Sequence, residues 1–471
     1  MDKFAEFNVA ARELVSAPPA AAKGLVAQPL AADLPPARRK LGGIVVVAVV
    51  AVVVVLALVV TLVPWRGSQD LEEPERYPIP VGVASPMLQW QRGYGGSGED
   101  VFTAVAVTAG GDIVVAGYSD SADGDFPRGN QGQNAVVAML DGQGELKWAK
   151  TFDGDGDDAF NSVALGEDGS IYVVGYAQNR VARGSRRDAL AMKLTPGGEL
   201  VWLLEMGGEG EDVFTHVVTW GDSLYVTGYT DSTDGDFPAT HGGQDAVLAC
   251  LSSNGALVWA TTYGGSGDDS FTSAAVRRDS EIVTVGRSTS RDIDVRTAMF
   301  PGYNAMLALF EVDGPLIGSW FYGGNSDDEF NDVVITADNR IYLAGATAST
   351  NGHLGYANHL GVRAGFACTV ELPSFQPDCS HIVPPTDVTM QAAVVLSQNQ
   401  RATVGGSTGD VWSGEIILET DLSGGTAVAG GGESGSRYLA AAAMTDGRLL
   451  VVGSEMKNGN TDALVAVFTI K

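Results

Sequence analysis

Short runs of alternating apolar and polar residues recur from about residue 87 to the end of the chain. SVALGEDGSIYVVG and DVVITADNRIYLAG each contain two such runs around a polar turn, and each ends in glycine. Strand side chains point alternately to two faces, so this pattern predicts pairs of half-buried antiparallel strands. A second pair follows, as in DAVLACLSSNGALVWATTY, where an apolar run, a glycine turn and a tryptophan strand succeed one another. We label the four predicted strands of a repeat a, b, c and d.

The same four-strand unit returns seven times. Five clear copies begin with a glycine- and aspartate-rich motif that ends in phenylalanine: YGGSGEDVF, GDGDDAF, GGEGEDVF, YGGSGDDSF and YGGNSDDEF. A glycine closes the first strand pair 14 or 15 residues after this phenylalanine. The sixth copy has Gln391 at the aromatic position and the seventh has Tyr438. The closing glycines are Gly117, Gly175, Gly228, Gly286, Gly345, Gly406 and Gly453. One four-stranded antiparallel sheet every 47–61 residues predicts a seven-bladed β-propeller.

The two ends of the repeat region are complementary. The region opens with a lone d-type strand at residues 87–94 and closes with a c-type strand at 462–471 that has no d partner. We therefore expect the first segment to complete the last sheet and leave no free seam in the ring.

A different pattern precedes the repeats. Residues 44–63 read IVVVAVVAVVVVLALVVTLV, with one threonine and no charge, directly after Arg38, Arg39 and Lys40. A helix of about twenty apolar residues spans the hydrocarbon core of a bilayer, and basic residues favour the cytoplasmic side. A cleaved signal peptide is the rival interpretation, but its apolar core is about 7–15 residues long and ends in a small-residue cleavage site, which VPWRGS lacks.

The predicted fold class is all-β: a seven-bladed β-propeller of four-stranded antiparallel blades, preceded by one transmembrane α-helix and a disordered N-terminal tail. The boundaries are 1–40 for a cytoplasmic disordered tail, 41–65 for the transmembrane helix, 66–86 for an extracytoplasmic linker and 87–471 for the propeller. The expected location is the cell membrane, with a single span, a cytoplasmic N-terminus and an extracytoplasmic propeller.

The repeats resemble the seven-bladed β-propeller repeat (SBBP repeat) family of bacterial surface and secreted proteins. The resemblance rests on W-x-x-x-Y-G-G-x-x-x-D-x-F followed by G-x-I-Y-V-x-G, covers roughly residues 87–471, and is weakest in the sixth copy. It implies the fold and a location at the cell surface, and it implies no single shared activity.

Charge narrows the choice of partners. The chain has 29 basic and 57 acidic residues, a formal net charge of −28. Such a surface repels nucleic acid, so we expect no nucleic-acid partner. In a propeller the d–a and b–c loops lie on one face, and these loops hold most of the acidic residues. The loop-rich face would attract cations or a basic partner, or its charge would serve solubility alone.

Aspartates recur at two kinds of position on that face. Asp100 and its counterparts stand two residues before the aromatic residue, and two loops read D-x-x-D-G-D. Ca²⁺ prefers oxygen ligands, so the candidate calcium ligands are Asp100, Asp120, Asp123, Asp125, Asp231, Asp234 and Asp236. The alternative interpretation is that the repeated aspartates cap the d–a turns through backbone N–H groups, and the loops lack the EF-hand pattern.

Loops that break the repeat are better candidates for a specific ligand. NRVARGSRRD in blade 2 is a basic cluster that could bind an anionic partner or neighbouring carboxylates, or remain a solvated loop. A glycine-rich loop in blade 5 carries two histidines and a tyrosine. The candidate ligand-binding residues are Arg180, Arg183, Arg186, Arg187, His353, Tyr356 and His359.

Cysteine placement bears on the compartment. Cys250 lies in an apolar run and is expected to be buried. Cys368 and Cys379 are expected on strands c and d of one hairpin, where a disulfide would form outside the cytoplasm; two free thiols are the alternative.

No catalytic set emerges from the motifs. The chain has no GxSxG, HExxH or Walker A pattern, so catalytic residues stay unassigned and an enzyme is the less favoured class. His216 is expected on inner strand a and could face the channel. We expect a binding or scaffold module for a protein, glycan or envelope component through the acidic loop-rich face. The alternatives are a polysaccharide-active hydrolase or lyase using channel carboxylates, and a purely structural spacer.

Overall fold

The computed structural model describes fourteen stretches of the chain. Every regular element within them is a β-strand. The described residues are 86–127, 132–154, 156–179, 186–278, 280–293, 300–354, 362–371, 375–382, 388–397, 400–407, 414–420, 425–430, 435–457 and 459–470.

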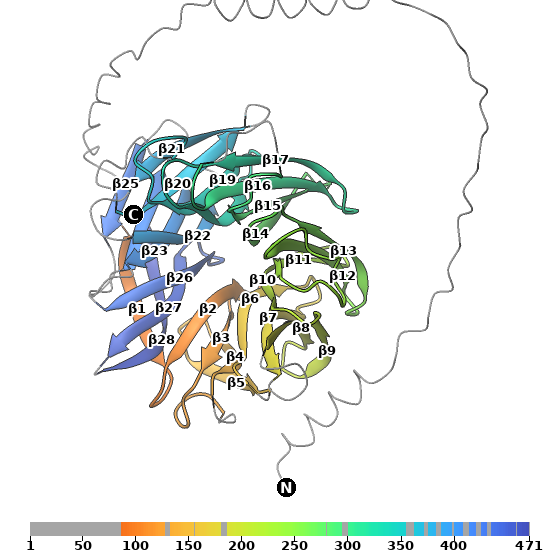
Figure 1. The fold of residues 1–471 in the computed structure, drawn as a ribbon. Coiled ribbons are helices and arrows are strands. Elements are labelled where there is room, and N and C mark those ends of the chain that lie inside the picture. The colour runs from red at the N-terminus through yellow and green to blue at the C-terminus, as the bar shows by residue number, and fades with distance from the viewer. Residues whose placement is uncertain are drawn as a thin grey trace, which may run out of the picture. The chain divides into compact units, whose positions relative to one another are not determined.

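The strands of these residues form seven four-stranded antiparallel sheets, each a blade (Figure 1). Blade 1 comprises β2 (Asp100–Val107), β3 (Ile113–Ser119), β4 (Asn134–Leu140) and β5 (Leu146–Phe152). Blade 2 comprises β6 (Ala159–Leu165), β7 (Ile171–Asn179), β8 (Arg186–Leu194) and β9 (Leu200–Met206). Blade 3 comprises β10 (Asp212–Trp220), β11 (Ser223–Thr230), β12 (Asp245–Ser252) and β13 (Leu257–Tyr263).

The remaining blades follow the same order along the chain. Blade 4 comprises β14 (Asp269–Arg277), β15 (Glu281–Ser288), β16 (Asn304–Glu311) and β17 (Leu316–Tyr322). Blade 5 comprises β18 (Asp328–Ile335), β19 (Ile341–Thr347), β20 (Ala364–Glu371) and β21 (Gln376–Ile382). Blade 6 comprises β22 (Val388–Ser397), β23 (Gln400–Ser407), β24 (Gly414–Thr420) and β25 (Gly425–Gly430). Blade 7 comprises β26 (Ser436–Ala443), β27 (Leu449–Lys457), β28 (Asn460–Ile470) and β1 (Pro86–Tyr94).

The innermost strands close a ring. Each of β2, β6, β10, β14, β18, β22 and β26 contacts the innermost strand of the next blade, and β26 contacts β2. In the last blade β1 pairs with β28 over its whole length, from Pro86 opposite Ile470 to Tyr94 opposite Ala463. The predicted pairing of the two ends of the repeat region is therefore confirmed, and Figure 1 shows β1 beside β28.

A β-bulge recurs in every inner strand and explains the repeated glycines. In blade 1 the bulge lies between Phe102 and Ala104, and Phe102 stands opposite Gly117. A Cβ on Gly117 would collide with the backbone oxygen of Val101, so the position accepts only glycine. In the sixth blade the residue at the aromatic position is Met390, opposite Gly405. The predicted pair Gln391 and Gly406 was one residue too late, because no aromatic residue marks the register there.

One part of the predicted fold class is corrected. It placed a transmembrane α-helix at residues 41–65 ahead of the propeller. The described residues are all-β, and they include no helix with the length and apolarity needed to cross a bilayer. Residues 41–65 lie outside the described residues, as do the tail at 1–40 and all but the last residue of the predicted linker at 66–86.

The core consists of apolar layers between successive blades. Six of the seven inner strands carry an aromatic residue directly before the bulge, and Phe102, Phe160, Phe214, Phe271, Phe330 and Tyr438 all have 0% exposure, as does Met390 of blade 6.

Side-chain hydrogen bonds connect the bulges of neighbouring blades. At each bulge the carbonyl oxygen of the aromatic residue is free to accept a hydrogen bond from the blade before it. Thr103 Oγ1 of blade 1 donates to Phe160 O of blade 2 at 2.6 Å, and Asn161 Nδ2 of blade 2 donates to Phe214 O of blade 3 at 2.8 Å. These bonds join neighbouring inner strands and satisfy edge groups that would otherwise be unpaired.

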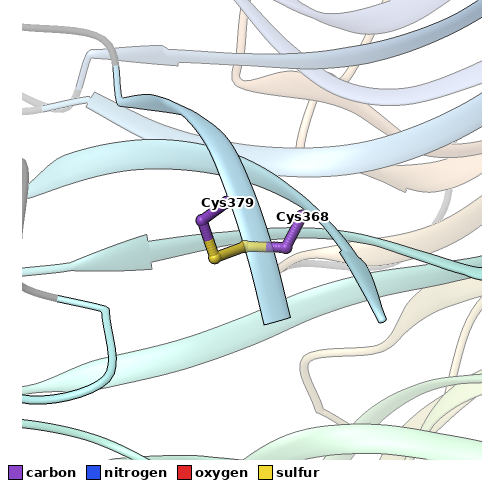
Figure 2. Close-up of a disulfide and its surroundings, with 2 residues drawn as sticks. All are labelled: Cys368 and Cys379. Atoms are coloured by element: carbon purple, nitrogen blue, oxygen red, sulfur yellow. A yellow bond between two sulfur atoms is a disulfide. The ribbon is translucent and has the colours of Figure 1, made fainter. Parts of the chain in front are cut away.

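Blade 5 carries a disulfide between its two outer strands (Figure 2). Cys368 on β20 and Cys379 on β21 stand opposite one another in the strand register, with their Cα atoms 4.1 Å apart. Directly opposed residues of antiparallel strands are close enough for this bond. Cys250 is a free thiol and is buried, as expected.

Candidate binding site on the loop-rich face

The repeated aspartates are buried and hold the d–a turns together. Asp100 is 0% exposed, and its Oδ2 accepts hydrogen bonds from the N–H of Gly96 at 2.9 Å and the hydroxyl of Ser121 at 2.7 Å. Asp212, Asp269 and Asp328 repeat the same pair of bonds to a glycine N–H four residues earlier and to a serine of the b–c loop. This geometry supports the capping interpretation of these residues rather than a ring of calcium ligands.

The D-x-x-D-G-D loops serve the same purpose. The carboxylates of Asp123 and Asp125 accept the N–H groups of Ser97 at 2.7 Å and Gly95 at 3.0 Å, and Asp120 accepts that of Glu99. In blade 3, Asp231, Asp234 and Asp236 accept the N–H groups of Glu211, Glu209 and Gly207. Each b–c loop is thus tied to the d–a turn beside it. In the described stretches no three carboxylate, histidine or cysteine side chains gather into an arrangement able to hold a metal ion.

Burial raises the pKa of some capping aspartates. Burial raises the pKa of Asp158 to about 7, against the opposing effect of the N–H groups of Gly154 and Gln178. It raises the pKa of Asp328 to about 6, and it also raises the pKa of Asp269. A carboxylate loses hydration energy on burial that backbone N–H groups only partly restore.

An open cavity of about 390 Å³ lies among these loops. It is lined by Arg186, Asp231, Gly242, Gly243, Gln244 and Asp268. Arg186 begins β8 of blade 2, the next four residues belong to the b–c loop of blade 3, and Asp268 precedes β14 of blade 4. The lining therefore combines a guanidinium, two carboxylates, an amide and glycine backbone, which together suit a ligand rich in hydroxyl groups.

A second cavity of about 380 Å³ lies at blade 7, lined in part by Gln91, Glu455 and Lys457. Its amide and carboxylate already bond to one another, since Gln91 Nε2 donates to Glu455 Oε2 at 2.8 Å. The cavity lined by Arg186 is formed instead by segments of three consecutive blades.

Sequence reasoning missed a histidine–aspartate pair beside the first cavity. His241 directly precedes Gly242, and its Nδ1 lies 2.7 Å from Oδ2 of Asp245. The His241 side chain is 59% exposed, whereas that of Asp245 is 0% exposed. One signal was available: the closely similar loop of blade 1 has Asn130 and Asn134 at the two corresponding positions.

A second polar cluster lies on the inner strands, and it includes His216. The backbone N–H of Ala274 donates to His216 Nδ1 at 3.3 Å, and Ser273 Oγ donates to Asp332 Oδ1 at 2.6 Å. Asp332 also accepts the N–H groups of Val333 and Ala393. Burial lowers the pKa of His216 and raises that of Asp332, and the two groups oppose these shifts in one another. His216 and Asp332 therefore accept hydrogen bonds from backbone N–H groups of the inner strands, and their acceptor atoms are occupied by these bonds.

The other predicted ligand residues are dispersed. Arg187 lies over the ring of Tyr176, 4.3 Å from its centroid, and so packs within blade 2. His353 is exposed, and its Nδ1 accepts the N–H of Gly323 at 3.4 Å, which assigns it to a turn of blade 5. Arg180, Arg183, Tyr356 and His359 lie outside the described residues. Of the described candidates, only Arg186 and Asp231 line the first cavity.

Comparisons with known proteins give the chain no function. No family model matches it. An uncharacterized protein of Aquifex aeolicus (strain VF5) is 35% identical over 104 residues, which is 22% of this chain and 28% of that protein's length. The chain therefore matches less than a third of the length of this relative.

Solved structures similar to it share 11% sequence identity. They include a protein of unknown function from Bacteroides caccae (TM-score 0.35, 61% of this chain and 87% of that chain) and YCF48 bound to a D1 peptide (TM-score 0.45, 82% and 98%). A puromycin hydrolase mutant complexed with PGG has a TM-score of 0.43, with 79% of this chain and 56% of that chain covered. The fold assignment rests on the sheet order and ring closure of the chain itself: this protein is a β-propeller.

Proposed function

We propose that the propeller is an extracytoplasmic binding module that takes a glycan at the cavity lined by Arg186. The observation that carries this proposal is the cavity itself, whose lining is polar and comes from three consecutive blades. Sugar hydroxyls both donate and accept hydrogen bonds, and carboxylates, amides and backbone groups are their usual partners in proteins.

Rigidity of the loops supports binding. Two lining carboxylates are already held by backbone groups: Asp231 accepts the N–H of Glu211, and Asp268 Oδ1 accepts the N–H of Gln244 at 3.2 Å. These parts of the lining are therefore ordered before a ligand arrives. A site that is already ordered loses less conformational entropy on binding, and more of the contact energy appears as affinity.

The disulfide supports the extracytoplasmic location. Disulfides persist in oxidising compartments and are rare in the cytosol. The bond between Cys368 and Cys379 thus fits a propeller exposed outside the cytoplasm. The repeated W-x-x-x-Y-G-G motif supports assignment of the blades to the SBBP repeat type, a type of surface and secreted proteins.

Hydrolysis by channel carboxylates has less support. Asp332 is the carboxylate beside His216, and its two oxygens already accept three hydrogen bonds from Ser273, Val333 and Ala393. A glycoside hydrolase needs one carboxyl group to act as acid and another to act as base or nucleophile.

The test is glycan binding by the full-length protein. We would screen neutral and acidic bacterial polysaccharides on an array and measure affinities by titration for wild type, Arg186→Ala and Gln244→Ala. Loss of a charged hydrogen bond costs roughly 1.5–3 kcal/mol, so Arg186→Ala should weaken binding about 10- to 100-fold. Arg448→Ala, at the end of the turn that joins β26 to β27, is the matched control and should bind normally. Absence of binding to every glycan, or binding that neither cavity variant weakens, would contradict the proposal.

A further inference from the structure

Blade 7 has a much shorter b–c connection than blades 1 and 3. In blade 1 the b–c loop joins β3 to β4 through residues 120–133, and in blade 3 it joins β11 to β12 through residues 231–244. In blade 7 the strands β27 and β28 meet in a hairpin, in which Lys457 stands opposite Asn460. The side chains at this end of blade 7 are therefore not tied to a long loop.

One acceptor that such a loop would engage has no partner in blade 7. Asp245, near the start of strand c in blade 3, accepts the backbone N–H of His241 in the b–c loop at 2.8 Å. Asn304 accepts a loop N–H in the same way in blade 4, at 3.1 Å. Asp462 has the corresponding place in blade 7, opposite Glu455. None of the residues that the structure describes donates a hydrogen bond to Asp462.

A second carboxylate lies close to Asp462. A Cβ added to Gly93 of β1 would stand 2.5 Å from Glu455 Oε1 and 3.5 Å from Asp462 Oδ2, so both carboxylates approach the same point of β1. Gln91 Nε2 donates to the other oxygen of Glu455, which leaves Oε1 without a donor among the described residues. The corresponding residues in blades 1, 3 and 5 are Ser119, Thr230 and Thr347. The carboxylate of Glu455 is therefore absent from those blades.

The blade 7 cavity of about 380 Å³ gives a ligand access to these groups. Its lining includes Gly93, Ser436, Glu455 and Lys457. Ser436 is 2% exposed, stands where blade 1 has Asp100, and has no hydroxyl partner in the described part of the chain. Lys457 is exposed and forms no ion pair with a described carboxylate. A carboxylate oxygen, a hydroxyl and an ammonium group are therefore available together.

The charges around Asp462 favour a cation beside it. Burial raises the pKa of Asp462, and the charges of Asp100 and Asp125 raise it further. Lys457 lowers this pKa but does not offset the other effects. A cation between Glu455 and Asp462 would stabilise the ionised form of both carboxylates.

The spacing of Glu455 and Lys457 suits a ligand that carries both charges. The two residues are two apart on β27, so their side chains lie on the same face of the sheet, roughly 7 Å apart along the strand. An α-amino acid has its ammonium and carboxylate groups on adjacent carbon atoms. Charge-assisted hydrogen bonds of roughly 2.8 Å at each end bring its total span close to that separation.

We propose that the blade 7 cavity binds a free α-amino acid. The ammonium group of the ligand donates to Glu455 Oε1 and to Asp462, in the role that a loop N–H has in blade 3. The carboxylate of the ligand accepts from Lys457 and from the Ser436 hydroxyl. The site is separate from the proposed glycan site, because the linings of the two cavities share no residue.

The test is amino acid binding by the full-length protein. Each common amino acid is titrated by calorimetry, and at least one should bind with a stoichiometry of one. The amino acid that binds is then compared with its Nα-acetyl derivative and its carboxamide. Acetylation removes the ammonium charge and amidation removes the carboxylate charge, so each derivative should bind roughly 10-fold more weakly or worse.

Substitutions assign the binding to this cavity. Asp462→Asn introduces the residue that blade 1 has at this place, Asn134, so the strand should form normally. Asp462→Asn, Glu455→Gln and Lys457→Met should each weaken binding roughly 10-fold or more. Asp446→Asn, in the turn between β26 and β27 at the other end of the blade, removes the same charge and should bind as wild type does.

The outcomes separate this proposal from a general loss of folding. The melting temperature of each variant without ligand is recorded, and the two ligand derivatives test the same contacts on the wild-type protein. Failure of every amino acid to bind would overturn the proposal. Equal affinity for the acetylated ligand, or wild-type affinity in Glu455→Gln and Asp462→Asn, would overturn it too. Glycan binding is measured separately, so either proposal can fail while the other stands.

Discussion

The ring of Phe375 stacks on the indole of Trp320, with centroids 3.4 Å apart and an interplanar angle of 11°. In four other blade interfaces the tryptophan of the outer strand lies against a glycine of the next blade instead. These pairs are Trp90 with Gly144, Trp148 with Gly198, Trp202 with Gly255 and Trp259 with Gly314, and each of the four glycines has a positive φ. Phe375, which contacts Trp320 in place of such a glycine, also has a positive φ, of 51°.

We predict that Phe375→Gly destabilises the protein less than Phe375→Ala. A non-glycine residue in the left-handed region costs about 1–2 kcal/mol, and an aromatic pair contributes about 0.5–1.5 kcal/mol beyond its buried area. Alanine loses the stack and keeps the strain, whereas glycine loses the stack and relieves the strain. Melting temperatures of the two variants measure the difference. A lower melting temperature for Phe375→Gly than for Phe375→Ala would show that the strain is not significant.

Gly117→Ala should be strongly destabilising, by about 2–4 kcal/mol, because the new Cβ would overlap the backbone oxygen of Val101 and force the inner strand away. Gly110→Ala is the matched control. Gly110 lies in the exposed turn between β2 and β3, and its nearest neighbour to an added Cβ is Thr108 Oγ1 at 3.7 Å. Urea denaturation midpoints of both variants test this, and equal midpoints would be inconsistent with the close backbone approach.

Removal of the disulfide should lower stability by about 2–3 kcal/mol, since it releases a loop closed over a sequence separation of 11 residues. The double variant Cys368→Ala/Cys379→Ala should melt at a lower temperature than wild type, and a reductant should lower the wild-type value to a similar extent. The double variant itself should not respond to reductant. A wild-type melting temperature that is unchanged by reductant would argue against the bond.

Stability should fall between about pH 4 and pH 7 through Asp158, whose pKa burial raises to about 7. The unfolded chain releases this proton near pH 4, so the folded state binds more protons across that interval. The contribution is fully present below the unfolded pKa and is lost as pH rises through 7. Asp158→Asn should flatten this part of a plot of melting temperature against pH.

Asp141→Asn is the control for the pH experiment. The N–H groups of Glu145 and Gln143 lower the pKa of Asp141, so its contribution is lost only as the pH falls below its ordinary value. This variant should leave the slope between pH 4 and pH 7 unchanged. If Asp158→Asn also leaves that slope unchanged, Asp158 is ionised in the folded protein throughout the interval.

Several features of the blades were predictable because they depend on neighbours in sequence. Period-2 alternation located the strand pairs, and the repeated spacing of Phe102 to Gly117 identified the copies. The bulge after Phe102 and the close approach of Gly117 to Val101 were found only in the structure. The prediction was wrong by one residue at Met390 and Gly405, where neither an aromatic residue nor an aspartate marks the register.

What the sequence by itself determined is the local unit: strands, turns and the pairing of the first segment with the last, all of which follow from alternation and from counting strands. Only the tertiary structure decided which loops meet. Arg186 and Asp268 are far apart in the chain and line one cavity because a ring brings the loops of consecutive blades to the same face. The tertiary structure also ties the D-x-x-D-G-D carboxylates to neighbouring turns, as Asp123 is to Ser97, and no local periodicity encodes contacts of that kind.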